Sequence, residues 1–192
     1  MNKTILKTAL ITLGSLVVAG ILIFSLWILI APQSMATVSE KLGNYNFAVT
    51  CANLKYKYSD ETEDLARCAE DSILSGEDKL IIKYCDPLVK CDNFDELCTK
   101  RNEKLADTLY GRYATSYKTY IIGNLAAAQY RLGDLQKAVQ TCELGDKECF
   151  KRLILEIVQN GTEEDRENVK KYPQQSENRE YVEEMIKILT QA

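Results

Sequence analysis

Hydrophobic and polar positions divide this chain into two parts with different patterns. Residues 8–31 contain no charged side chain, and Leu, Ile and Val dominate the stretch. At 1.5 Å per residue, a helix of that length reaches about 36 Å, which exceeds the ~30 Å hydrocarbon core of a bilayer. Trp27 lies near its end, where interfacial aromatic residues occur, and Pro32 follows. The pattern predicts a transmembrane helix over 8–31.

A cleaved signal peptide is the alternative interpretation of this segment, with a cut after Ala36. Secretory apolar cores usually contain about 7–15 residues, and this one is longer. We therefore favour an uncleaved signal-anchor. Ser15 and Ala19 form one small-xxx-small pair in the span, a pattern of helix–helix association. Weak self-association through the span is therefore an open alternative.

The orientation of the span follows from its flanking lysines. Lys3 and Lys7 precede it, whereas no basic residue follows it until Lys41. Basic residues stay preferentially on the cytoplasmic side of a membrane. We expect residues 1–7 to form a short cytoplasmic tail and residues 32–192 to form an extracytoplasmic domain.

The remainder of the chain has a helical pattern. Apolar residues recur at three- and four-residue spacing, Gly is sparse, and capping signals such as Thr162 with Asp165 punctuate the sequence. We expect an all-α body of antiparallel helix pairs. The predicted helices cover residues 34–42, 45–57, 61–74, 77–89, 94–110, 113–131, 134–143, 146–159, 163–171 and 177–190.

An internal repeat is visible within this helical pattern. Residues 42–49 match residues 132–139, each starting with Leu-Gly and containing Ala six positions after that Leu. A small residue precedes both turn glycines by seven positions, at Ala36 and Ala126. A third, weaker copy is anchored on Gly76, with Ala69 and Ile81 in the corresponding places. Each copy predicts a helix–turn–helix unit in which small residues let two helices approach closely.

The segment 124–139 resembles a tetratricopeptide repeat (TPR), and residues 35–52 resemble the end of one such unit and the start of its second helix. The residues on the family pattern are Leu125, Ala126, Gly133, Leu135 and Ala138. Ile122 replaces the usual Trp, and no Pro closes the unit. The resemblance implies an α-solenoid of TPR-like hairpins with a concave, protein-binding face. It places three predicted partner-binding residues in that groove: Tyr120, Tyr130 and Arg131.

The C-terminal segment is predicted to cap this stack. Residues 177–190 form an amphipathic helix that would shield the last apolar face from water. Its predicted apolar face contains Tyr181, Val182, Met185, Ile188 and Leu189.

The amino-acid composition excludes several kinds of catalytic and binding site. Histidine is absent, so imidazole bases and His-ligated zinc are excluded. Lys3 and Lys7 are the only charged residues among the first 36; removing them from 24 basic residues leaves 22 against 28 acidic residues, a net charge of −6 for the remainder. A mildly acidic body without a basic stripe argues against nucleic-acid binding. With no catalytic constellation in the sequence, we expect a non-enzymatic protein with no cofactor and no metal site.

The seven cysteines admit two interpretations. Cys68, Cys85 and Cys142 align with core positions of the repeat, where Cys acts as a small buried hydrophobe. The alternative is disulfide formation, which an oxidising compartment would permit. The pairs that helical turns could bring together are Cys51 with Cys68, Cys142 with Cys149, and Cys98 with Cys85 or Cys91.

Two further motifs each have a structural and a functional interpretation. Four tyrosines at helical spacing predict core packing in preference to an aromatic binding surface: Tyr110, Tyr113, Tyr117 and Tyr120. The Asn160-Gly161-Thr162 run fits a glycosylation sequon. We favour a structural interpretation, in which Asn160-Gly161 ends one helix and Thr162 is the N-cap of the next.

Together these features predict a membrane-anchored helical-repeat adaptor or assembly factor that binds protein partners at the membrane, outside the cytoplasm. One alternative is a thiol-active or metal-binding ectodomain that uses Cys91 and Cys98. Another alternative is a structural spacer.

Overall fold

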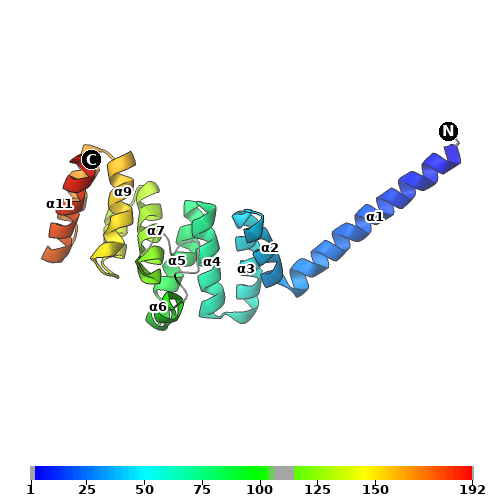
Figure 1. Ribbon diagram of the computed structural model, residues 1–192, viewed down its shortest axis with the longest axis horizontal. Helices are drawn as coiled ribbons and strands as arrows, with labels where there is room; N and C mark the ends of the chain where they lie inside the picture. The colour runs from blue at the N-terminus through cyan, green and yellow to red at the C-terminus, as the bar shows by residue number, and fades with distance from the viewer. Residues whose placement is uncertain (1–2, 104, 106–114, 192) are drawn as a thin grey trace.

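The computed structural model describes residues 3–103, 105 and 115–191, and all regular elements of this part are helical (Figure 1). The all-α prediction is therefore confirmed. The helices are α1 (Lys3–Ile30), α2 (Pro32–Lys41), α3 (Tyr45–Ser59), α4 (Thr62–Ser75), α5 (Asp78–Val89), α6 (Phe94–Asn102), α7 (Tyr117–Arg131), α8 (Leu135–Cys142), the 3₁₀ turn η3 (Lys147–Cys149), α9 (Phe150–Asn160), α10 (Glu163–Lys171) and α11 (Ser176–Gln191).

Helix α1 projects away from the remaining helices (Figure 1). Its segment Ile11–Ile30 has a mean hydropathy of 2.6, is long enough to cross a membrane, and is not buried inside the protein. The chain turns at Ala31, and Pro32 begins α2, where its missing N–H costs no helical hydrogen bond. The last turns of α1 touch the body, where the Phe24 ring stacks on Phe47 of α3 with centroids 6.3 Å apart.

Helices α2 to α11 stand side by side in a row (Figure 1). Successive helices pack on one another: α2 on α3, α3 on α4, α4 on α5, α5 on α7, α7 on α8 and α9, and α11 on α9 and α10. A continuous apolar core runs between them from Val49 in α3 to Ile186 in α11. Each helix thus buries its apolar stripe mainly against its neighbours in the row.

Three hairpins reproduce the internal repeat: α2–α3, α4–α5 and α7–α8. Their turn glycines all adopt a positive φ, 72° at Gly43, 71° at Gly76 and 91° at Gly133. Side chains rarely tolerate this backbone, which explains the glycine at each turn. The small residues of the pattern are buried within the hairpins: Ala36, Ala48, Ala69, Ala126 and Ala138, with Ile81 in the third copy.

Two predicted boundaries differ from the structure by several residues, the end of the helix expected over 94–110 and the start of the helix expected over 113–131. Part of another prediction lies outside the described residues. The helix expected over 94–110 ends at Asn102, whose side-chain oxygen accepts a hydrogen bond of 2.7 Å from the backbone N–H of Tyr117. Helix α7 begins at Tyr117 after Ser116, which caps it. Tyr110 and Tyr113 lie outside the described residues, while Tyr117 and Tyr120 are buried.

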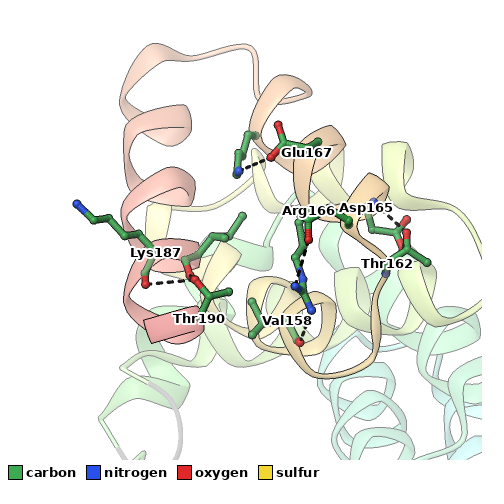
Figure 2. Close-up of polar contacts among 10 residues, drawn as sticks. Val158, Thr162, Asp165, Arg166, Glu167, Lys187 and Thr190 are labelled. Atoms are coloured by element: carbon green, nitrogen blue, oxygen red, sulfur yellow. Dashed lines mark hydrogen bonds and ion pairs between the residues drawn. The ribbon is translucent and has the colours of Figure 1, made fainter. Parts of the chain in front are cut away.

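The C-terminal helices close the row (Figure 1), and Figure 2 shows polar contacts among them. Thr162 and Asp165 form a reciprocal capping box at the start of α10, as the sequence predicts. Arg166 reaches back from α10 and donates a hydrogen bond of 3.1 Å to the backbone oxygen of Val158 in α9. Helix α11 packs on α9 and α10 through Val182.

The predicted apolar face of α11 needs one correction. Ile188 is 51% exposed, and Ile186 is buried in the core instead. Val182 and Ile186 are four residues apart, so they lie on the same side of the helix. Ile188 is two residues beyond Ile186 and points away from that side.

Candidate functional site

The three residues that the TPR resemblance places in a groove are engaged within the chain. Tyr120 is buried, and the Tyr130 hydroxyl donates a hydrogen bond of 3.1 Å to Asp165 Oδ2 in α10. Burial and this contact raise the pKa of Tyr130 to about 12. The structure therefore gives both tyrosines a packing role. Contact with a partner stays a prediction for them.

Arg131 connects three helices. From the end of α7 its Nη1 donates to Glu156 Oε2 of α9 at 2.7 Å, and its Nη2 donates to Asp78 Oδ1 of α5 at 2.6 Å. Its Nε adds contacts of 2.9 and 3.1 Å to the Asp78 carboxylate. Paired carboxylates on either side of a guanidinium make strong, directional contacts. We assign Arg131 to the bridging of α5, α7 and α9.

A different surface has the geometry of a binding site. A pocket of about 390 Å³ lies over α4, with α2 on one side and α6 contributing to its wall. Its lining contains five carboxylates and two guanidinium groups: Gln33, Glu40, Glu63, Asp64, Arg67, Glu70, Asp71, Leu74 and Arg101. This volume is within the usual range of about 300–1,000 Å³ for ligand pockets. The lining has a formal charge of −3 if all these groups are ionised.

Most charged groups in this pocket have partners. Arg67 donates from Nη2 to Glu40 Oε1 at 2.6 Å and to Thr37 Oγ1 at 2.7 Å, tying α4 to α2. Arg101 lies 3.2 Å from Glu63 Oε2 and 3.4 Å from Glu70 Oε1, tying α6 to α4. Both cations of the lining are therefore already committed to carboxylates.

The remaining carboxylates differ in their surroundings. Asp64 accepts a hydrogen bond of 2.9 Å from Gln33 Nε2 and one from the Ser59 hydroxyl, and it lies 3.7 Å from Lys55 Nζ. Asp71 is only 3% exposed, and its Oδ2 is buried without a hydrogen-bond partner. A buried polar atom without a hydrogen-bond partner costs about 1–3 kcal/mol. Asp71 is therefore the exceptional residue of the pocket.

The electrostatics reflect this arrangement. Burial, together with the neighbouring Glu40, raises the pKa of Asp71 to about 8. Burial also raises the pKa of Glu70, although Arg101 and the Tyr117 hydroxyl, which donates to Glu70 Oε1 at 2.9 Å, act in the opposite direction. At neutral pH Asp71 is therefore mainly protonated.

The sequence pattern alone does not identify this pocket, although it contains one relevant signal. Asp64 and Asp71 are seven residues apart in one predicted helix, and such a spacing places both on one face. Two acidic residues on the face that also includes Cys68 indicate buried carboxylates. That Gln33, Glu40 and Arg101 come to the same place depends on how three helices pack.

The cysteines are free thiols in the structure, and no pair lies at disulfide distance. The disulfide interpretation of the six candidate residues therefore has no structural support. Cys142 and Cys149 are neighbours, but the Cys142 thiol donates to the Cys149 backbone oxygen at 3.5 Å and the two are not bridged. Six thiols are buried, and Cys91 is half-buried, with its Sγ donating to the Pro87 oxygen at 3.4 Å.

The thiol-active alternative requires an activated thiol or a cluster of metal ligands. Burial raises the pKa of Cys98 to about 11, the opposite of activation. Over the described ranges, no group of three or more acidic or Cys side chains could hold a metal ion. Neither observation favours thiol or metal chemistry at Cys91 and Cys98.

Comparison with protein-family models, curated proteins and solved structures finds no match to this chain.

Proposed function

We propose that this chain is a signal-anchored adaptor whose helical body, an α-solenoid of TPR-like hairpins, binds a protein partner beside the membrane through the pocket over α4. Helix α1 is the anchor, with residues 1–7 in the cytoplasm and the body outside it. The observation that carries the binding role is the acid-lined pocket, in which the buried Asp71 has one carboxylate oxygen, Oδ2, without a hydrogen-bond partner.

Retention of the anchor is supported by α2. A signal-peptide cut after Ala36 would divide this helix, in which Met35 and Ala36 are buried against α3. Cleavage would remove Gln33 from the pocket and separate the start of α2 from the body. An uncleaved chain keeps the first hairpin intact.

A position close to the membrane is supported by the contacts of the anchor. The Phe24–Phe47 stack and the packing of Ile28 against the Met35 cluster join the last turns of α1 to the first hairpin. The pocket begins on α2, the next helix along the chain. A partner bound there would be held near the bilayer surface.

The experiment fills the pocket without changing its charge. Leu74→Trp introduces a large side chain into the lining, and Leu144→Trp makes the same change at an exposed turn after α8, outside the pocket. Full-length protein is purified from chemically crosslinked membranes, after circular dichroism has confirmed folding. A defined partner should be recovered with wild type and Leu144→Trp and lost with Leu74→Trp. Equal recovery with all three proteins would refute the site.

A further inference from the structure

The pocket has the chemistry of a receptor for a cation. Its two guanidinium groups contact Glu40, Glu63 and Glu70, and the charge of Arg67 offsets the raised pKa of Asp71 only in part. Asp71 Oδ2 has no hydrogen-bond partner despite complete burial of the atom. Charge-assisted hydrogen bonds from a positively charged donor would satisfy that oxygen.

A metal ion is not the cation that the geometry suits. Hard divalent cations need several oxygen ligands arranged around one point. No cluster of three or more acidic or Cys residues with that arrangement exists in the described chain. An ammonium or guanidinium group needs only one or two carboxylate acceptors, because its own N–H groups make directional bonds.

We propose that Asp71, with Glu40 beside it, binds the ammonium or guanidinium group of a Lys or Arg side chain from the protein partner, and that binding releases one proton. This inference rests on the proposed function and specifies its chemistry. In the free protein the Asp71 carboxyl holds the proton. On binding, the O–H bond breaks, the proton passes to the buffer, and the carboxylate accepts a hydrogen bond from the ligand.

The titratable and charged groups that face Asp71 set the pH dependence. They are Glu40 from α2, Cys51 from α3, Arg67, Cys68 and Glu70 from α4, and Arg101 from α6. Burial raises the pKa of Cys51 and that of Cys68, the latter to about 12, so both remain neutral thiols at neutral pH. The arginines stay charged throughout.

The sign of the effect follows from the raised pKa of Asp71. Below pH 8 the carboxyl is protonated, and a cation must displace its proton; above pH 8 it is already charged. With a pKa of about 8, the ionised fraction rises from about one tenth at pH 7 to about nine tenths at pH 9, so the affinity should increase about tenfold. A lysine probe keeps its own charge over this interval because its pKa is about 10.4.

The test is calorimetric titration of full-length protein in neutral detergent with Nα-acetyl-lysine methylamide. Nα-acetyl-norleucine methylamide, which lacks the charge, is the matched probe, and putrescine represents a free amine. Titrations at pH 7 and 9, and at pH 7 in buffers of different ionisation enthalpy, measure the affinity change and the proton release. Asp71→Asn removes the carboxylate, and Asp92→Asn removes one exposed charge outside the lining.

We expect saturable binding of the lysine probe to wild type, about tenfold tighter at pH 9 than at pH 7. The norleucine probe should not bind. The lysine probe should not bind to Asp71→Asn and should bind normally to Asp92→Asn. Equal binding of norleucine, no binding at pH 9, or an unchanged pH profile in Asp71→Asn would overturn the proposal. Tighter binding of putrescine would overturn the assignment to a peptide side chain.

If Asp71→Asn does not fold, Glu40→Gln provides the second variant. Removing the Glu40 charge should move the midpoint of the pH dependence downward, and an unmoved midpoint would contradict the proposal. If the lysine probe does not bind but a partner is recovered with wild type and lost with Leu74→Trp, this inference is rejected and the proposed function stands. Lysine binding without any recoverable partner would reject the adaptor function and leave the chemistry of the pocket standing.

Discussion

Replacing Arg131 by Ala tests whether this residue holds three helices together. The change removes the donors to Glu156 and Asp78, whose side chains are only 11% and 21% exposed, and leaves both carboxylates without that counter-charge. Breaking a fully buried pair costs about 3–5 kcal/mol, whereas exposed pairs are worth about 0.2–1 kcal/mol. The intermediate burial of this site places the expected loss of unfolding free energy at about 2–3 kcal/mol.

The assay is urea unfolding of the full chain in nonionic detergent, followed by far-ultraviolet circular dichroism. Fluorescence would not report on the body, because the single Trp, Trp27, lies in α1. Arg152→Ala is the control, since Arg152 is exposed on α9 and its loss should change the free energy by less than about 0.5 kcal/mol. Adding Glu156→Gln to Arg131→Ala should recover about 1 kcal/mol relative to additivity. A loss below 0.5 kcal/mol for Arg131→Ala would refute the bridging role.

Three further predictions concern the turns, the thiols and the topology. Gly133→Ala should destabilise the body by roughly 1–2 kcal/mol because φ is 91° there. No neighbour would contact the new Cβ, so the cost is purely conformational. Gly133→Asn should cost less in the same unfolding assay, and a larger loss for Asn than for Ala would contradict this explanation. Brief alkylation of the native protein should modify Cys91 first, whereas the unfolded, unreduced protein should take up seven groups by intact mass; a lower final number would reveal a disulfide. A reporter that works only outside the cytoplasm should be active when fused to the C-terminus. If a reporter that works only in the cytoplasm is active there instead, the predicted orientation is reversed.

Local features of the fold could be predicted from the sequence because their causes are local. Gly43, Gly76 and Gly133 identify the hairpin turns, since each turn needs a positive φ. Thr162 and Asp165 identify the start of α10 because both halves of a capping box are four residues or fewer apart. The apolar, uncharged run likewise identifies α1.

The candidate site could not be predicted in the same way because it depends on packing between helices. Asp71 and Asp64 signal a polar face on α4, but the sequence does not place Glu40 or Arg101 beside it. Partner binding by Arg131 stays a prediction of the family resemblance, which does not indicate its contacts within the chain. Its position in the repeat suggests a groove residue, while its two acidic partners come from α5 and α9, 53 and 25 residues away in the chain.

The most direct test of the adaptor function is site-specific photo-crosslinking in intact membranes. A benzophenone amino acid replaces Leu74 in the pocket or Leu144 at the exposed turn, each in the wild-type and Asp71→Asn chains. We expect one adduct of defined mass from position 74, no such adduct from position 144, and a strong reduction of the position-74 adduct by Asp71→Asn. The same adducts from both positions, or none from position 74, would contradict the adaptor function.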